Sequence, residues 1–196
     1  MKHCIIFAHP KLNSFNGAIL HNYRQALEEY GHDVEVRDVY RLNWDPVLTW
    51  EEYQAQFNGK YATDVLVEQA FIREAEAVTF IYPVWWAGLP ARAKGYLDRV
   101  FAYGFAYELD GEDPIPLLKG KKAATIFTSG TPEEIYRTSG MSESLKKTME
   151  EGVFDFCGFE TIGHLYFGNA VLSSDQERER MLFEVSKFAG GFKEES

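Results

Sequence analysis

Five short segments of the chain carry the hydrophobic pattern of β-strands. They are residues 3–8, 33–38, 77–83, 123–128 and 160–167. The segments 3–8 and 77–83 are almost continuously apolar, as in strands that are buried on both faces of a parallel sheet. The segment 33–38 alternates between apolar and charged residues instead, which indicates a strand nearer the edge.

Segments with helical spacing of apolar residues follow these strands. The first begins at residues 14–16, whose Ser-Phe-Asn sequence is typical of a helix start, and ends near Gly31. The others are residues 64–75, 92–101, 141–152 and 175–189. Strands that alternate with helices predict an α/β fold, a five-stranded parallel sheet with helices on both faces. Because no repeat or linker divides the chain, we expect one domain over residues 1–196.

The charge of the chain argues against nucleic-acid and membrane partners. Its formal net charge is −10, which repels phosphate backbones and anionic lipids, and no run of Lys and Arg offsets it. No segment reaches the ~20 apolar residues of a membrane span, and the first ten residues lack the pattern of a signal peptide. We therefore expect a cytoplasmic protein without stable membrane association.

The cysteines and histidines show no pattern of a metal site. Cys4 and Cys157 are far apart among apolar neighbours, so we expect buried thiols rather than a disulfide or a metal centre. The five histidines form no metal-binding motif, and we expect no metal.

A doubly wound sheet binds its ligand at the carboxyl ends of its strands, which selects the loops 9–16, 83–90 and 128–137. The first has neither a GxGxxG sequence nor a P-loop. It does lead into a helix amino terminus with the side chains of Ser14 and Asn16, and such a terminus suits a phosphate group. The alternative is that these two residues only cap the helix.

The other loops suit a flat, conjugated ligand. Trp85 and Trp86 cannot both enter the same core, so one of them either lines a flat-ring site or belongs to a hydrophobic cluster or dimer contact. The small residues at 128–131 permit a close approach of the main chain to a ligand, or form a plain connection. The Tyr107 hydroxyl either binds a ligand oxygen or lies at the surface.

Four motifs in this order carry a family resemblance: AHP and SFN within 8–16, PVWWAGLPA at 83–91, KGYLDRVFAYGFAY at 94–107 and TSG at 128–130, with CGFE at 157–160. They closely resemble the NAD(P)H quinone reductases, also called DT-diaphorase-like enzymes, which have the flavodoxin-like fold. The resemblance implies a homodimer with a bound flavin, FAD or FMN, that passes hydride from NAD(P)H to a quinone or a similar small acceptor. We favour FAD.

The resemblance also implies the site residues. The catalytic ones are Tyr107 and Tyr136. The residues that bind the cofactor are His9, Ser14, Phe15, Asn16, Pro83, Val84, Trp85, Trp86, Thr128, Ser129, Gly130, Thr131 and Arg178. Backbone amides of the loop after residue 83 are expected to face the polar edge of the flavin.

Two positions depart from the family pattern. Mammalian members have a second tyrosine where this chain has Leu109, and a histidine where it has Ser142. The departures leave the natural acceptor and any Tyr–His proton relay open. Two other functions also stay open: an electron carrier of the flavodoxin type, and a regulatory subunit of a potassium-efflux system.

Overall fold

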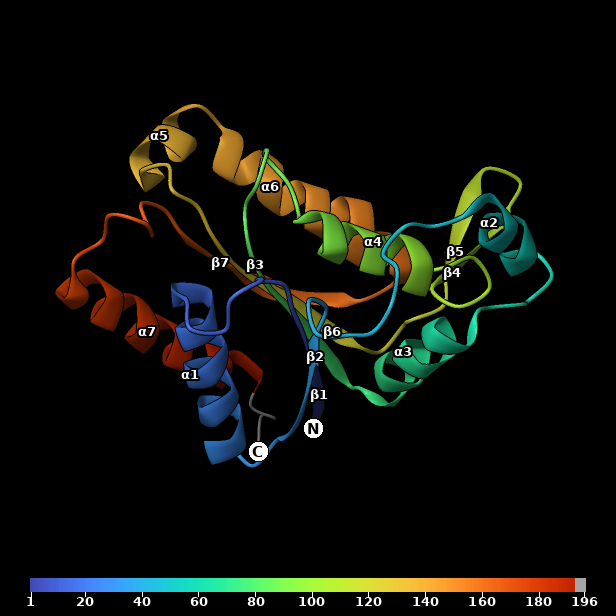
Figure 1. The fold of residues 1–196 in the computed structure, drawn as a ribbon, viewed down its shortest axis with the longest axis horizontal. Helices are drawn as coiled ribbons and strands as arrows, with labels where there is room; N and C mark the ends of the chain where they lie inside the picture. Colours follow the sequence, from blue (N-terminus) through green and yellow to red (C-terminus); the bar gives the residue numbers. More distant parts are fainter. Residues whose placement is uncertain (193–196) are drawn as a thin grey trace.

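The computed structural model describes residues 1–192, and residues 193–196 of the expected domain lie outside the described part. Its main sheet has five parallel strands in the order β2-β1-β3-β6-β7 (Figure 1). The strands are β1 (Lys2–Phe7), β2 (Asp33–Asp38), β3 (Ala77–Pro83), β6 (Lys122–Thr128) and β7 (Glu160–Phe167). All five predicted strands are present, and the strand order is that of a doubly wound, flavodoxin-like sheet.

Helices cover both faces of this sheet (Figure 1). One face packs against α1 (Phe15–Glu29) and α7 (Asp175–Ala189), and the other against α3 (Thr63–Glu74), α4 (Ala91–Val100) and α6 (Met141–Met149). Alternate residues of β1 enter the two cores, because successive strand side chains point to opposite faces. Ile5 packs toward α1 and α7, whereas Cys4 packs toward α3 and α4. The predicted α/β fold is thus confirmed.

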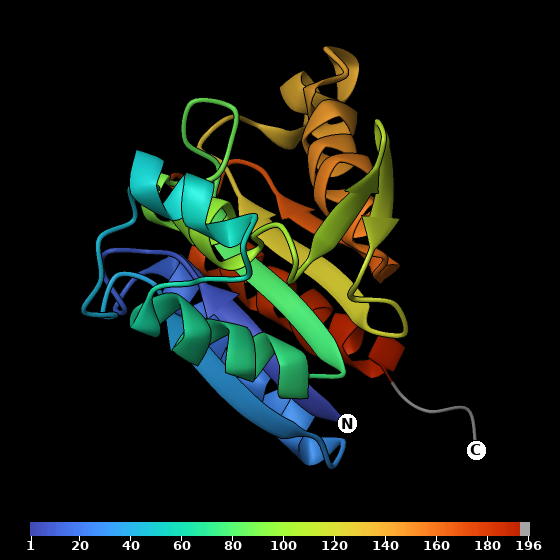
Figure 2. The ribbon, with the colours of Figure 1, turned by 90° about the vertical axis from the view of Figure 1, so that its right-hand side faces the viewer.

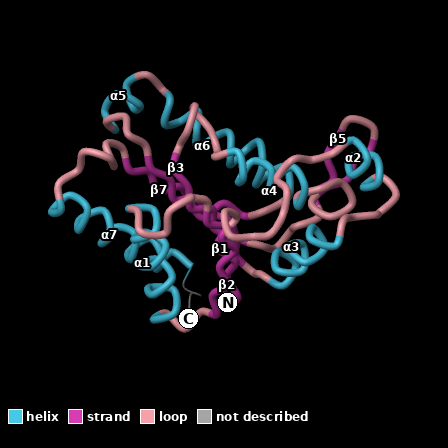
Figure 3. Tube along the Cα trace, in the orientation of Figure 1, coloured by secondary structure: helices cyan, strands magenta, loops and turns pink. Residues whose placement is uncertain are grey.

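The chain between β2 and α3, which had no hydrophobic period, is irregular except for the short helix α2 (Trp50–Gln56) (Figure 3). Thr49 and Glu52 begin this helix with a reciprocal capping box. Seven residues hold too few apolar positions to show a helical period, so the sequence pattern missed α2.

Two arginines of α4 hold this segment in place. The Arg92 guanidinium donates to the carbonyl oxygens of Val39, Leu42 and Trp44. The buried Arg99 guanidinium binds the carboxylates of Glu52 and Asp64 and the carbonyl oxygen of Asp45. Carbonyl groups that no regular structure would satisfy are therefore paired with cationic donors.

The hairpin of β4 (Tyr107–Asp110) and β5 (Asp113–Pro116) was not predicted. It is antiparallel and separate from the main sheet (Figure 2). Beyond it, α5 (Glu133–Thr138) precedes α6, and a π-helical turn at Glu150–Asp155 continues α6. Each strand of the hairpin has four residues, the lower limit for recognising alternation, and β5 contains two prolines.

The helices of residues 1–192 are too short or too polar to cross a lipid bilayer.

Candidate functional site

The loops after β1, β3, β6 and β7 meet at the carboxyl edge of the sheet and surround a cavity of about 510 Å³. Eleven of the thirteen residues expected to bind the cofactor line it. The lining residues are His9, Ser14, Phe15, Asn16, Pro83, Val84, Trp85, Thr128, Ser129, Gly130, Ala170, Val171 and Arg178. The fold therefore brings segments more than 160 residues apart in the sequence to one site.

The amino terminus of α1 forms one end of this cavity. Ser14 is its N-cap and accepts a hydrogen bond from the Gly17 N–H at 3.2 Å. The N–H groups of Phe15 and Asn16 have no protein acceptor in residues 1–192. Ser14 thus caps the helix and also lines the cavity, and two free N–H groups and the helix dipole create an anion-binding end.

Glycine at position 17 permits this arrangement. A Cβ atom there would lie 1.6 Å from the carbonyl oxygen of Leu12. The loop can therefore fold back across the first turn of α1 only because residue 17 has no side chain.

Asn16 lies on the wall between α1 and β6. Its Nδ2 donates to Thr128 Oγ1 at 2.9 Å, and its Oδ1 atom is buried without a partner in the described residues. A buried acceptor without a donor is destabilising, by roughly 1–3 kcal/mol. Because this orphaned atom belongs to the cavity wall, it is available to a hydrogen-bond donor of a molecule in the cavity.

The loop after β3 turns sharply between Trp85 and Gly88. The two residues exchange backbone hydrogen bonds of 3.0 and 3.1 Å, and Trp86 and Ala87 have φ angles of 52° and 55°. Trp85 faces the cavity and lies 6.2 Å from the His9 ring, whereas Trp86 is fully exposed and does not line it. The tight turn directs the two adjacent indoles apart.

Two amides of this loop are not free for a ligand, contrary to expectation. The Val84 N–H donates to the Thr128 carbonyl oxygen at 2.7 Å, and the Trp85 N–H donates to Gly88. The hydrogen bonds of the turn consume these donors. In this loop the Trp86 N–H has no acceptor within residues 1–192.

The loop after β6 supplies the opposite wall. Ser129 and Gly130 line the cavity, and the Ser129 hydroxyl donates to the Thr131 carbonyl oxygen at 3.0 Å. Thr131 itself does not line the cavity. Ala170 and Val171, from the loop after β7, do line it and were missed. Small apolar residues carry no chemical signal in the sequence. The signal that the chain does offer is the position of this loop, directly after the predicted strand 160–167.

Arg178 supplies the positive charge of the site. It lies in the first turns of α7, its Nε donates to Ser173 Oγ at 3.2 Å, and its guanidinium carbon lies 5.9 Å from the centre of the Phe15 ring. A guanidinium in this position suits a phosphate group near the amino terminus of α1.

Neither tyrosine expected to be catalytic lines this cavity. Tyr107 lies in β4, where it lines a second cavity of about 340 Å³ and packs against Phe156 with ring centres 4.8 Å apart. Burial raises the pKa of the Tyr107 hydroxyl. Tyr136 lies in α5 with its ring stacked on Tyr166, and Ser142 donates to its carbonyl oxygen at 3.4 Å. The two cavities share no lining residue.

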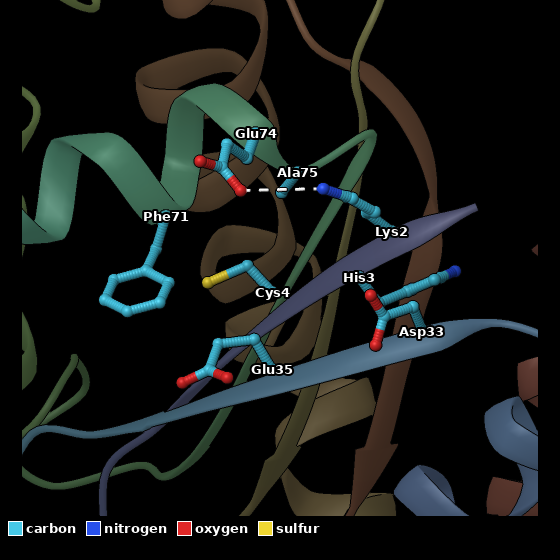
Figure 4. Close-up of a pocket in the computed structure, with 8 residues that line it drawn as sticks. All are labelled: Lys2, His3, Cys4, Asp33, Glu35, Phe71, Glu74 and Ala75. Atoms are coloured by element: carbon cyan, nitrogen blue, oxygen red, sulfur yellow. Dashed lines mark ion pairs between the residues drawn. The ribbon is translucent and has the colours of Figure 1, made fainter.

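A third cavity, of about 140 Å³, lies at the opposite edge of the sheet, beside the amino end of β1 (Figure 4). Lys2 and Glu74 form an ion pair of 3.5 Å across it, and burial raises the pKa of the Cys4 thiol to about 12. The thiol is therefore protonated and unreactive at neutral pH. We assign no site to this cavity.

Comparison with known proteins agrees with the fold. Residues 1–188 match the family model described as the flavodoxin-like fold. The chain is 39% identical to an uncharacterized NAD(P)H oxidoreductase of Haemophilus influenzae, and the match covers 93% of this chain and 91% of that protein. It is 30% identical to the ribosyldihydronicotinamide dehydrogenase [quinone] of Rattus norvegicus, over 97% and 92% of the two chains.

A solved structure gives a similar result. The NAD(P)H:quinone oxidoreductase from Methanothermobacter marburgensis superposes with a TM-score of 0.87 at 32% identity. The superposition covers 100% of this chain and 98% of the other.

Proposed function

Because the chain belongs to the flavodoxin-like family and, within it, to the NAD(P)H quinone reductases, we propose that it is a flavin-dependent oxidoreductase. In this proposal NAD(P)H is the hydride donor and a quinone or a similar small molecule is the acceptor, and the two occupy the site in turn. The observation that carries the proposal is the cavity at the carboxyl edge, with an anion-binding end, an aromatic wall and an orphaned buried acceptor.

The residues present fit a flavin. The free N–H groups of Phe15 and Asn16, together with the Arg178 guanidinium, are the donors that a phosphate or pyrophosphate group requires. Trp85 supplies a flat apolar wall, and Asn16 Oδ1 awaits a hydroxyl or N–H donor. We propose FAD rather than FMN, because Arg178 adds a cationic donor to the free N–H groups at the amino terminus of α1.

A bound flavin supplies the hydride chemistry, which no side chain of this site supplies. The chain itself binds and orients the flavin and the substrates, and it excludes water from the site. The N–H group of Gly130, a residue that lines the cavity, has no acceptor in residues 1–192 and would donate to the polar edge of the ring. Such preorganised donors stabilise negative charge that develops there.

Both thiols are unpaired, which suits the reducing cytoplasm that we propose as the location.

We further propose that the site is completed by a second copy of the chain. Tyr107 lines a different cavity from the predicted flavin site, which favours a role at the flavin of a second subunit. Next to that cavity, α2 and the residue that follows it expose three aromatic side chains, Trp50, Tyr53 and Phe57. The Tyr53 ring packs against those of Trp50 and Phe57, with ring centres 5.6 and 5.3 Å apart. Exposed aromatic surface of this kind is typical of subunit interfaces.

Cofactor content and turnover test the proposed activity. The purified protein should contain about one flavin per chain, which heat release and chromatography identify as FAD or FMN. With NADPH and a benzoquinone it should turn over steadily, with the parallel double-reciprocal lines of a ping-pong reaction. A colourless protein whose Tm neither flavin raises would contradict the proposal. A flavoprotein without steady turnover would instead be an electron carrier.

The oligomeric state tests the second proposal. Light scattering should give about twice the 22.5 kDa chain mass. Trp50→Glu should weaken the dimer, whereas Phe183→Glu, an equally exposed aromatic on α7, should not. A monomer with full activity, or a Trp50→Glu protein that dimerises normally, would contradict this interface.

A further inference from the structure

Tyr166 lies behind the wall of the predicted flavin cavity, outside its lining. It is the penultimate residue of β7 and pairs in register with Phe127 of β6. Its ring lies between those of Phe127 and Tyr136, with centres 5.1 and 6.1 Å away and interplanar angles of 26° and 15°. Tyr82 of β3 continues the same stack beyond Phe127. Packing across three strands therefore fixes the direction of the Tyr166 hydroxyl.

That hydroxyl meets Ser129, whose side chain lines the cavity. The two oxygens are 2.7 Å apart, and the Ser129 hydroxyl donates its single proton to the Thr131 carbonyl oxygen. Tyr166 must therefore donate to Ser129, because each hydroxyl has only one proton to give. Burial raises the pKa of Tyr166, so the donor stays protonated at neutral pH.

Further hydrogen bonds join the loop after β6 to the loop after β7. The Ser129 N–H donates to the Phe167 carbonyl oxygen, and the Ser129 carbonyl oxygen accepts from the Ala170 N–H, both at 2.9 Å. The Thr131 carbonyl oxygen accepts from the Asn169 N–H at 2.9 Å. Every polar group of Ser129 is thus bound within the protein, whereas the N–H groups of the next two residues have no acceptor in residues 1–192.

We propose that Tyr166 is a positioning residue which, through Ser129, holds the 128–131 loop so that the N–H group of Gly130 faces the ring of a bound flavin. This inference rests on the proposed function. Without the Tyr166 hydroxyl, the Ser129 side chain can rotate away from Thr131, and the Gly130 N–H loses its fixed direction.

The proposal predicts a difference between the two redox states of the flavin. Preorganised N–H donors stabilise a reduced flavin ring, which carries negative charge, more than a neutral oxidised one. Loss of the hydrogen bond from Tyr166 to Ser129 should weaken binding of the oxidised flavin about threefold and binding of the reduced flavin about tenfold. The reduction potential of the bound flavin should fall accordingly.

The decisive experiment compares Tyr166→Phe with wild type and with Tyr82→Phe. Both variants remove one hydroxyl from the ring stack and keep the ring, but within residues 1–192 the Tyr82 hydroxyl makes no hydrogen bond to Ser129. For each protein, flavin affinity is measured in both redox states by fluorescence titration, and the Tm is measured without flavin. A Tyr166→Phe, Ser129→Ala double variant shows whether the two residues act as one unit.

We expect the larger loss of affinity for the reduced flavin in Tyr166→Phe only. The double variant should bind flavin no more weakly than Ser129→Ala alone. Equal losses in both redox states, or the same losses in Tyr82→Phe, would overturn the proposal in favour of a packing role. Unchanged affinities in Tyr166→Phe, while wild type binds flavin, would overturn it and leave the proposed function intact. A wild-type protein that binds no flavin would overturn both.

Discussion

Asn16 donates from Nδ2 to Thr128 Oγ1 at 2.9 Å, and this buried contact joins the first turn of α1 to the end of β6 across 112 residues. It uses one half of the amide and leaves Oδ1 in the cavity wall without a partner. The side chain therefore both holds the two walls together and is available to a ligand.

Replacement of Asn16 should affect flavin binding more than folding. Asn16→Leu keeps the approximate size but removes both polar atoms, so we expect a five- to tenfold weaker flavin affinity, roughly the loss of one hydrogen bond. The apoprotein should change little, because the unpaired acceptor disappears as well. Fluorescence titration and thermal unfolding measure the two effects. Asn13→Leu, on the exposed part of the same loop, is the control and should bind normally.

Arg178 should distinguish the two flavins. If its guanidinium binds the pyrophosphate or adenosine half of FAD, Arg178→Gln should weaken FAD about tenfold, the value of one charged hydrogen bond, and leave FMN nearly unchanged. Arg180→Gln, two residues further and exposed, is the matched control. An equal loss for FMN and FAD would place the arginine at the phosphate that both cofactors share.

The turn after Trp85 should gain stability from glycine. Ala87 has a φ of 55°, a left-handed conformation that is unfavourable by roughly 1–2 kcal/mol for a residue with a Cβ atom. Ala87→Gly should therefore raise the free energy of unfolding by about 0.5–1 kcal/mol, after the larger unfolded-state entropy of glycine is subtracted. Urea titrations measure this gain. The contrasting variant Ala55→Gly, inside α2, should lower the free energy of unfolding by a similar amount. Ala87→Gly without a gain would mean that the turn relaxes freely.

His3 should make folding sensitive to acid. The side chain is buried, neither ring nitrogen has a partner in residues 1–192, and burial lowers its pKa to about 3, with help from the positive charges of His32, the amino terminus and Lys122. The unfolded chain, with a histidine pKa near 6.5, then binds more protons than the folded one. This contribution to stability is complete above pH 6.5 and is lost as the pH falls from 6.5 toward 3.

Urea midpoints from pH 8 to pH 4 measure this loss, which reaches about 1.4 kcal/mol per pH unit for one proton. His3→Phe should flatten the dependence of the free energy of unfolding on pH between pH 6.5 and 4. Carboxyl groups contribute to this dependence only near the lower end of that range. Wild type and His3→Phe with the same slope would show that His3 titrates normally in the folded state.

Tyr107→Phe should leave the flavin bound and lower kcat/KM about fivefold, the effect of one neutral hydrogen bond. Ser142 occupies the position of the relay histidine and turns toward the Tyr136 backbone, so we do not expect the larger loss of a proton relay. Stopped-flow kinetics separate flavin reduction by NADPH from reoxidation by a quinone. Unchanged rates in both halves would remove Tyr107 from the site.

The elements that the sequence predicts well are those whose pattern repeats over many residues. The buried run at 77–83 and the periodic helix after Ser14 lie within a residue or two of their predicted bounds. The hairpin at 107–116 and helix α2 are too short for a period, and their positions depend on Phe156, Arg99 and other partners distant in the sequence.

The candidate site was predictable as a set of loops but not as a set of hydrogen bonds. The rule that ligands bind at the carboxyl edge selects the loops around Ser14, Trp85 and Ser129 without coordinates. Which donors stay free depends on tertiary pairing, as the engaged amide of Val84 shows. Sequence also cannot place Trp86 outside the cavity, because its direction follows from two successive positive φ angles.

The three carbonyl groups that Arg92 binds have a consequence for the order of folding. They lie about 50 residues before the arginine, so these contacts have a large sequence separation and close a long loop. Until α4 has docked, the carbonyl oxygens of Leu42 and Trp44, for which Arg92 is the donor in residues 1–192, are left to water. Residues 39–44 should thus acquire their conformation after the folding transition state, and a weakened Arg92 would accelerate unfolding far more than it slows folding.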